Sequence, residues 1–116
     1  LGDLIKTAGA NVTPREVEVV LQALPAVREA YVVGVSHPDR GDNVAAAVIL
    51  SEGASPDAAA LREALRSELS AYKLPRHLWF VTAVPMTDSG KPDKKRLRSE
   101  LEARIAAGDL GEIPTA

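Results

Sequence analysis

One lysine stands where a side chain could act outside its own domain. Lys91 directly follows the turn-forming residues Thr87, Ser89 and Gly90. These residues form poor strand and helix interiors, so they predict a loop between an apolar strand-like run and a helix-like pattern. We expect this loop to be ordered but mobile, and a long cation on it could reach a negative charge elsewhere. The pattern therefore predicts a catalytic lysine that works in a site this chain does not itself contain.

Taken without further context, Lys91 would be an ordinary solvated surface lysine, because lysine is rarely buried or functional by default. The two histidines, His37 and His77, are forty residues apart and have no cysteine or cluster of carboxylates beside them. We interpret both as loop residues and expect no metal site in this chain.

The composition is that of one soluble globular domain. The chain has 116 residues, of which 46% are hydrophobic and 26% charged, and its net charge is −2. These values argue against disorder and give no reason to expect nucleic-acid or anionic-membrane binding. The chain contains no cysteine, which removes disulfides and thiol nucleophiles and fits a cytoplasmic protein. The longest apolar runs are too short to span a bilayer, so we expect no transmembrane segment.

The N-terminal half predicts a ribbon, a helix and a hairpin. Short apolar runs on both sides of Gly9 are consistent with a small β-ribbon. Thr13, Pro14 and Glu16 predict a capped helix start, and the helix should end before Pro25. Runs of Val, Ile and Ala at residues 30–35 and 44–50 predict two strands joined by turn residues, hence an antiparallel hairpin in a central, doubly covered position.

The C-terminal half predicts helix, strand and helix. A second helix should begin at residues 55–57 and end near Pro75, followed by a third strand at 78–84 and a last helix at 94–107. The expected fold is α/β (α+β), with a small, partly antiparallel three-stranded central sheet flanked by helices, plus a short N-terminal β-ribbon. We expect the domain to occupy residues 1–107 and residues 108–116 to form a loose tail.

The remaining charged residues and Trp79 have structural interpretations. Lys73 should extend along the end of the second helix, near its C-terminus. Glu18 is expected to be exposed or to make a domain contact, and Trp79 to pack in its strand. A solvated helix face is the expected role of the basic run formed by Lys94, Lys95, Arg96 and Arg98.

Four segments of the sequence, in this order, carry a resemblance to a known family. They are Asp3-Leu4-Ile5-Lys6-Thr7-Ala8-Gly9-Ala10-Asn11-Val12, Ala30-Tyr31-Val32-Val33-Gly34-Val35, Tyr72-Lys73-Leu74-Pro75 and Pro85-Met86-Thr87-Asp88-Ser89-Gly90-Lys91. Together they resemble the C-terminal domain of the adenylate-forming superfamily of acyl-CoA synthetases, luciferases and nonribosomal adenylation domains. The resemblance covers residues 2 to about 101, and the sequence is most similar to fatty-acid or related acyl-CoA ligases.

The resemblance implies a two-step enzyme that uses ATP, Mg2+ and CoA. A carboxylic acid attacks ATP to give an acyl-adenylate, and CoA then takes the acyl group, while the small domain swings between the steps. ATP and Mg2+ would be bound mainly by an N-terminal domain. The chain would be a piece cut from the same longer polypeptide, and it would be inactive alone.

The same resemblance assigns roles to six positions. It implies that Lys91 serves adenylation and that Gly9 and Ala10 line the channel of the CoA pantetheine arm. Lys6 would approach the site of the second step or be an exposed strand residue. The hinge position falls on Gly2, with Asp3 beside it.

Two alternatives stay open. The chain could belong to an adenylation domain that loads a carrier-protein thiol, or it could be a non-catalytic α/β binding module that keeps only the fold. A purely structural module would have no need of a lysine at the tip of this loop.

Overall fold

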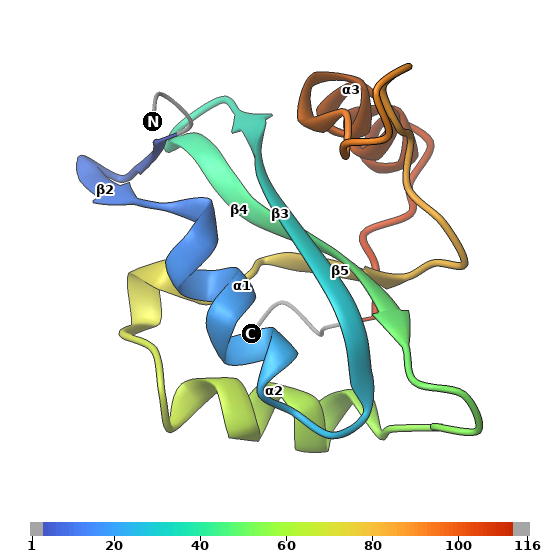
Figure 1. The fold of residues 1–116 in the computed structure, drawn as a ribbon. Helices are drawn as coiled ribbons and strands as arrows, with labels where there is room; N and C mark the ends of the chain where they lie inside the picture. Colours follow the sequence, from blue (N-terminus) through green and yellow to red (C-terminus); the bar gives the residue numbers. More distant parts are fainter. Residues whose placement is uncertain (1–3, 113–116) are drawn as a thin grey trace.

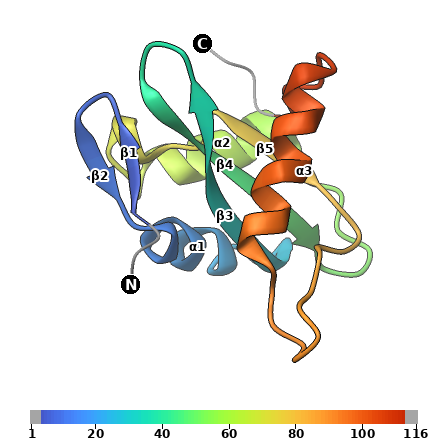
Figure 2. The same cartoon turned by 90° about the horizontal axis from the view of Figure 1, so that it is seen from above.

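A five-stranded sheet separates two helical layers. The computed structural model describes residues 4–112, with α1 and α2 on one face of the sheet and α3 on the other (Figures 1 and 2). The predicted fold class is confirmed. In chain order the elements are β1 (Ile5–Thr7), β2 (Ala10–Val12), α1 (Pro14–Gln22), β3 (Val27–His37), β4 (Gly41–Leu50), α2 (Ala58–Arg66), the 3-10 turn η1 (Ala71–Lys73), β5 (His77–Phe80) and α3 (Lys94–Ala106).

Strand β4 is the centre of the sheet. It pairs antiparallel with β3 along their length, from His37 opposite Gly41 to Val27 opposite Leu50, so the predicted hairpin is confirmed. Strand β5 pairs parallel with β4 over four residues. The β1–β2 ribbon is joined to the same sheet by one pair, Thr7 opposite Gly41, and is therefore not a separate unit.

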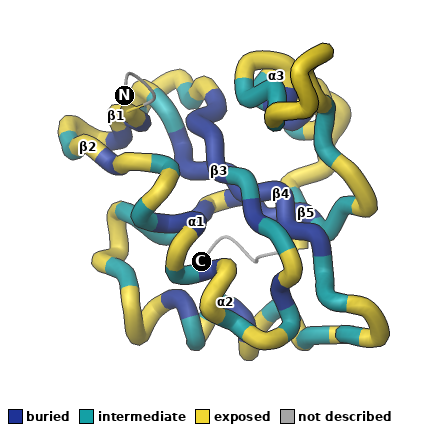
Figure 3. The backbone as a smooth tube through the Cα atoms, viewed as in Figure 1, coloured by how far each residue is buried: buried dark blue, intermediate teal, exposed yellow. Residues whose placement is uncertain are grey.

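Both faces of the hairpin are buried, which explains its almost continuous apolar sequence. Val32, Val44 and Ala46 face α1 and α2, whereas Val33 and Ala45 face α3. The alternation follows from the two-residue period of a strand. Figure 3 shows the resulting band of buried backbone along β3, β4 and β5.

Helix α1 begins as its sequence predicts. The Thr13 hydroxyl accepts a hydrogen bond from the Glu16 backbone N–H, and the Glu16 carboxylate accepts from the Thr13 N–H at 2.9 Å. This reciprocal capping box satisfies two N–H groups that the first turn would leave unpaired. Val17 and Leu21 then enter the core against the sheet.

The second helix is shorter than predicted. Asp57 caps it, and it ends at Arg66 rather than near Pro75, with η1 following. Leu74 is extended because it precedes Pro75, and the residue before a proline avoids helical backbone angles. Strand β5 also ends earlier than predicted, at Phe80, which lies opposite Val48 of β4.

The described part of the predicted tail is bound to β5 rather than loose. The Asp109 carboxylate accepts a hydrogen bond from Trp79 Nε1–H at 2.9 Å, and the Glu112 N–H donates to the Leu78 carbonyl at 2.6 Å. Gly111 has φ +94°, and a Cβ there would lie 2.5 Å from the Leu78 carbonyl oxygen. Only glycine can therefore bring the backbone this close to the strand.

Among the helices of residues 4–112, none has the length and apolar character needed to cross a membrane.

Candidate functional site: a lysine turn and a glycine hairpin

Lys91 lies in a tightly hydrogen-bonded turn, residues 86–92, which we call the lysine turn. The Thr87 N–H donates to the Lys91 carbonyl at 2.7 Å, and the Lys91 N–H donates to the Thr87 hydroxyl at 3.2 Å. Gly90 has φ +84°, the left-handed conformation that glycine adopts without cost. The backbone of Lys91 is thus fixed while its side chain is exposed.

The base of the lysine turn is joined to α3. Met86 and Pro92 form an isolated antiparallel bridge, and the Asp93 N–H donates to the Pro85 carbonyl at 2.8 Å. The Asp93 carboxylate caps α3 by accepting from the Arg96 N–H at 3.0 Å. The orientation of Lys91 therefore depends on where α3 begins.

The second predicted site is the turn of the β1–β2 ribbon, which we call the glycine hairpin (residues 5–12). Ala8 and Gly9 have φ +52° and +82°, and a Cβ added at Gly9 would meet nothing within 4 Å. The tip of this hairpin is therefore open backbone that a ligand can approach. Ala10 is partly exposed in β2, and Lys6 is exposed in β1, where its backbone lies opposite Asn11 of β2.

The turn between β3 and β4 supports the glycine hairpin. The Ala8 N–H donates to the Arg40 carbonyl at 2.9 Å, and Arg40 Nη2 donates to the Thr7 hydroxyl at 3.4 Å. Gly41 has φ +84°, and a Cβ there would lie 2.9 Å from the Lys6 carbonyl oxygen. The hairpin is therefore attached to the central sheet through close backbone contact.

The lysine turn and the glycine hairpin project from different parts of the molecule. Figure 2 shows the turn beyond the N-terminal end of α3, with the hairpin at the opposite corner, at the edge of the sheet that β1 and β2 form. Figure 1 separates them as well. The structure thus does not bring Lys91 together with Gly9 or Lys6, and the two features present different surfaces to any partner.

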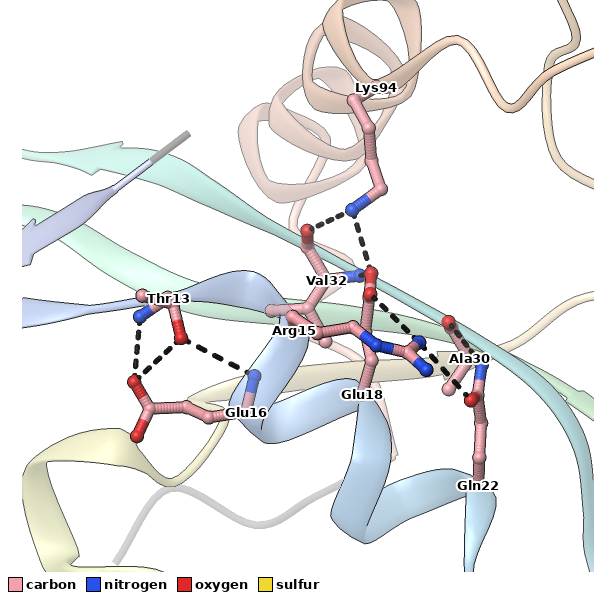
Figure 4. Close-up of polar contacts among 8 residues, drawn as sticks. All are labelled: Thr13, Arg15, Glu16, Glu18, Gln22, Ala30, Val32 and Lys94. Atoms are coloured by element: carbon pink, nitrogen blue, oxygen red, sulfur yellow. Dashed lines mark hydrogen bonds and ion pairs between the residues drawn. The ribbon is translucent and has the colours of Figure 1, made fainter. Parts of the chain in front are cut away.

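A buried carboxylate connects three elements at the start of α3. Glu18 of α1 is only 8% exposed, and its Oε2 accepts from the Val32 N–H at 2.8 Å and from Lys94 Nζ at 2.7 Å (Figure 4). Lys94 also donates to the Val32 carbonyl at 3.0 Å. The expectations of an exposed Glu18 and a solvated Lys94 are therefore wrong, because the packing of α1, β3 and α3 brings these residues together inside the domain.

Arg98, one turn along α3, also faces inward. Its guanidinium lies 3.3 Å from Asp42 Oδ1 and 3.3 Å from Glu102 Oε2, and it donates to the Ser36 hydroxyl at 3.0 Å. The Ser36 N–H, donating to Glu102, is the main reason that the pKa of Glu102 lies below its usual value. Within the basic run of α3, Lys95 and Arg96 keep the solvated character that was predicted.

Lys73 contacts the first helix rather than the end of the second. Its Nζ lies 2.6 Å from Glu16 Oε1, which joins η1 to the capping box of α1. This ion pair is the largest cause that lowers the pKa of Glu16 to about 2, and it raises the pKa of Lys73. The predicted position along the second helix is wrong because that helix ends seven residues before Lys73.

His77 is a buried strand residue rather than a loop residue. It stacks on Trp79 with ring centroids 5.7 Å apart, and its Nδ1 lies 3.0 Å from the Leu110 carbonyl. Trp79 is buried, as predicted. No group of three or more His, Asp or Glu side chains within residues 4–112 could hold a metal ion. The hinge residues Gly2 and Asp3 lie outside the described residues.

Comparison with known proteins identifies the family. Residues 16–91 match the AMP-binding enzyme C-terminal domain, and the chain belongs to this family. The predicted membership of the adenylate-forming superfamily is thereby confirmed.

Among curated relatives, the chain is 44% identical over 102 residues to a medium/long-chain-fatty-acid–CoA/3-oxocholest-4-en-26-oate–CoA ligase of Mycobacterium tuberculosis. This alignment covers 88% of the chain and 19% of the relative. The chain is also 41% identical over 113 residues to 4-hydroxybutyrate–CoA ligase 1 of Metallosphaera sedula, covering 95% of the chain and 20% of that protein. The chain thus spans about a fifth of the length of these relatives.

Solved structures share the fold. MatB from Rhodopseudomonas palustris superposes with a TM-score of 0.83 at 37% identity, over 88% of this chain and 20% of MatB. The amide bond synthetase McbA from Marinactinospora thermotolerans gives a TM-score of 0.79 at 45% identity, over 84% of this chain and 20% of McbA.

Proposed function

We propose that this chain is the swinging C-terminal domain of an acyl-CoA synthetase, which activates a carboxylic acid with ATP and transfers the acyl group to CoA. The observation that carries the proposal is the exposed side chain of Lys91 on a fixed turn, within a chain that belongs to the AMP-binding enzyme C-terminal domain family. Curated relatives at 41–44% identity are named as CoA ligases of fatty and hydroxy acids, which supports this substrate class.

Lys91 has the chemistry that adenylation requires. In this step a carboxylate must approach the α-phosphate of ATP, and negative charge grows on the phosphoryl oxygens as pyrophosphate leaves. A positioned ammonium group offsets the repulsion between the two anions and stabilises the transition state. Lys91 acts as a cation and not as a base, so it needs no lowered pKa. The backbone of Lys91 is fixed, so less of the ammonium group's stabilisation of the transition state is lost to motion of the residue.

The glycine hairpin suits the second step. The pantetheine arm of CoA needs a narrow passage in which backbone can approach it closely, and Gly9 presents no side chain at the open tip. Main-chain groups of Gly9 and Ala10 could then bind the arm. Lys6, exposed one strand away, is a further candidate for the second site. This hairpin and the lysine turn lie apart. A rotation of the domain about Gly2 and Asp3 would therefore exchange one for the other at the substrates bound by the N-terminal domain.

The remaining substrate sites belong to a partner domain in this proposal. The N-terminal domain of the same enzyme would bind ATP, Mg2+ and the acid. Residues 4–112 contain no group of three or more His, Asp or Glu side chains that could hold a metal ion by themselves. A cytoplasmic location remains a prediction from the sequence.

The test is to measure both half-reactions of the enzyme that contains this chain joined to its N-terminal domain. We expect exchange of pyrophosphate into ATP that depends on the carboxylic acid. We also expect CoA-dependent thioester formation, to be measured with a series of short to long carboxylic acids. The 116-residue chain alone should do neither, and steady pyrophosphate release from a preparation free of contaminating synthetase would contradict that. Absence of both reactions in the joined enzyme would favour the non-catalytic binding module.

A different acceptor is the second candidate. The 45% identity to an amide bond synthetase shows that a closely similar domain occurs in a protein named for amide formation. The joined enzyme should therefore be offered CoA, an amine and a carrier-protein thiol in parallel. Adenylation followed by transfer only to an amine, or only to a carrier protein, would replace the CoA ligase proposal.

A further inference from the structure

The buried contact between Glu18 and Lys94 has consequences for Lys91, given the function proposed above. Glu18 Oε2 accepts two hydrogen bonds, from the Val32 N–H at 2.8 Å and from Lys94 Nζ at 2.7 Å. Lys94 completes the arrangement by donating to the Val32 carbonyl at 3.0 Å. One lysine thus contacts both the helix α1 and the strand β3 (Figure 4).

Loss of one partner from this contact should destabilise the domain more than loss of one partner from a surface ion pair. The side chain of Glu18 is 10% exposed and that of Lys94 is 30% exposed, so water cannot fully replace either partner. Removing one partner of such a pair leaves a buried charge or a buried acceptor uncompensated. The geometry of the pair is therefore strongly enforced in the folded domain.

Lys94 is also the first residue of α3, three residues after Lys91. The lysine turn reaches α3 through the Met86–Pro92 bridge and the hydrogen bond from the Asp93 N–H to the Pro85 carbonyl. Only two residues, Pro92 and Asp93, lie between Lys91 and Lys94. Pro92 forms the bridge to Met86, and Asp93 donates the hydrogen bond to Pro85. Displacing the start of α3 would therefore displace the whole lysine turn.

We propose that Glu18 and Lys94 form a positioning pair that sets the Lys91 ammonium for adenylation. Neither residue touches a substrate in this proposal. Their role is to fix the start of α3 against α1 and β3, so that Lys91 arrives in one orientation when the domain closes. A misplacement of about 1 Å at a reacting group can cost about a hundredfold in rate. A small shift at the start of α3 is therefore sufficient to slow adenylation.

Arg98 provides the matched control on the same helix. It forms ion pairs with Asp42 and Glu102 one turn further from the lysine turn, and its side chain is 39% exposed. Loss of Arg98 removes a cation and an anchor of α3 while the start of the helix stays attached to Glu18. Lys95, exposed beside Lys94, controls for the loss of positive charge alone.

The variants to compare in the joined enzyme are Lys94→Met, Lys94→Arg, Arg98→Met, Lys95→Met and the double variant Glu18→Gln/Lys94→Met. The double variant removes both charges, and the amide oxygen of the new glutamine can still accept the Val32 N–H. It should therefore stay folded even where the single Lys94→Met change destabilises the domain, since neutral replacement of a buried pair is often well tolerated.

Adenylation and thioester formation from supplied acyl-adenylate are measured separately, with thermal unfolding as the check of the fold. Lys94→Met and the double variant should lose at least about tenfold in adenylation, a rate effect typical of misplacement, and stay within about twofold of the parent in thioester formation. Lys94→Arg should recover most of the adenylation rate, and the two control variants should keep it. A folded double variant that adenylates at the parent rate, or that loses both half-reactions equally, would overturn the proposal.

Amide hydrogen exchange of residues 85–93 tests the pair independently of catalysis. The double variant should exchange faster there than the parent, whereas Arg98→Met should not. Unchanged exchange in the double variant would overturn the positioning role even if the rate falls. If the parent enzyme shows no adenylation, the proposed function fails, and the exchange result still decides whether the pair orders the turn.

Discussion

Thr87 and Lys91 bind each other twice across the lysine turn, through the Thr87 N–H to the Lys91 carbonyl and the Lys91 N–H to the Thr87 hydroxyl. Both bonds use the backbone of Lys91, so its side chain can be removed without breaking the turn. This makes Lys91 suitable for a clean test of catalysis.

Lys91→Ala in the joined enzyme should reduce adenylate formation by about a hundredfold to a thousandfold, the usual effect of losing one preorganised electrostatic contact. Thioester formation from supplied acyl-adenylate should be largely spared, because the glycine hairpin projects from a different corner of the domain. Half-reaction assays of Lys91→Ala and of the charge control Lys95→Ala check this. Thermal unfolding checks the fold, and equal loss in both half-reactions by a folded Lys91→Ala enzyme would show that the two steps share Lys91.

Gly9→Leu should give the reverse pattern. At φ +82° a leucine costs about 1–2 kcal/mol in backbone strain, and its side chain would project from the open tip into the proposed pantetheine channel. Pyrophosphate exchange should survive while transfer to CoA fails.

Gly53→Leu is the matched control for that change. Gly53 has φ +78° and equally open surroundings, but it lies in the connection between β4 and α2. It should suffer the same strain and keep the transfer step. Normal transfer to CoA by folded Gly9→Leu enzyme would show that the channel is elsewhere.

Gly111→Ala should detach the segment at residues 109–112 from β5. The new Cβ would lie 2.5 Å from the Leu78 carbonyl oxygen, so the backbone must move away. We expect a loss of about 1–3 kcal/mol in the free energy of unfolding, as for other strained backbone sites, and a change in Trp79 fluorescence. Gly108→Ala, with φ +91° and no atom within 4 Å of its Cβ, measures the strain without the clash.

The ion pair between Glu16 and Lys73 should make stability depend on acid pH. The pKa of Glu16 is about 2 in the folded domain against 4.5 for a free glutamate, so its contribution is fully present above pH 4.5 and is lost as the pH falls toward 2. Lys73→Met should therefore destabilise the domain at pH 7, and its difference from the parent should shrink between pH 4.5 and 2. Urea unfolding at about pH 7, 4 and 2.5 measures this, and a difference that stays constant would contradict the pairing.

Local signals in the sequence were sufficient for the elements that depend on nearby residues. The capping box of Thr13 and Glu16 lies within four residues, and the β3–β4 hairpin follows from two apolar runs joined by a turn. Lys91 could be singled out because its turn residues are contiguous. The assigned roles of Lys91, Gly9 and Lys6 stay predictions, since they concern sites beyond this chain.

The contacts that periodicity could not reveal join distant segments. Glu18 and Lys94 are 76 residues apart, and only the way α1 and α3 pack against β3 brings them together. A basic run gives no sign of which cation faces inward, so the sequence alone predicts a solvated Lys94. The docking of Asp109 likewise depends on the side chain of Trp79, which sequence proximity does not indicate.

The docked segment at residues 109–112 has a consequence for self-association. Strand β5 lies beside β4, and the carbonyl of Leu78 that would otherwise be free on its outer side is bound by the Glu112 N–H. Unpaired strand edges are templates on which a second chain can add a strand, and natural proteins cover them. The close approach of Gly111 to Leu78 therefore also protects this edge of the sheet. Loss of this contact would cause aggregation at high protein concentration as well as lower stability.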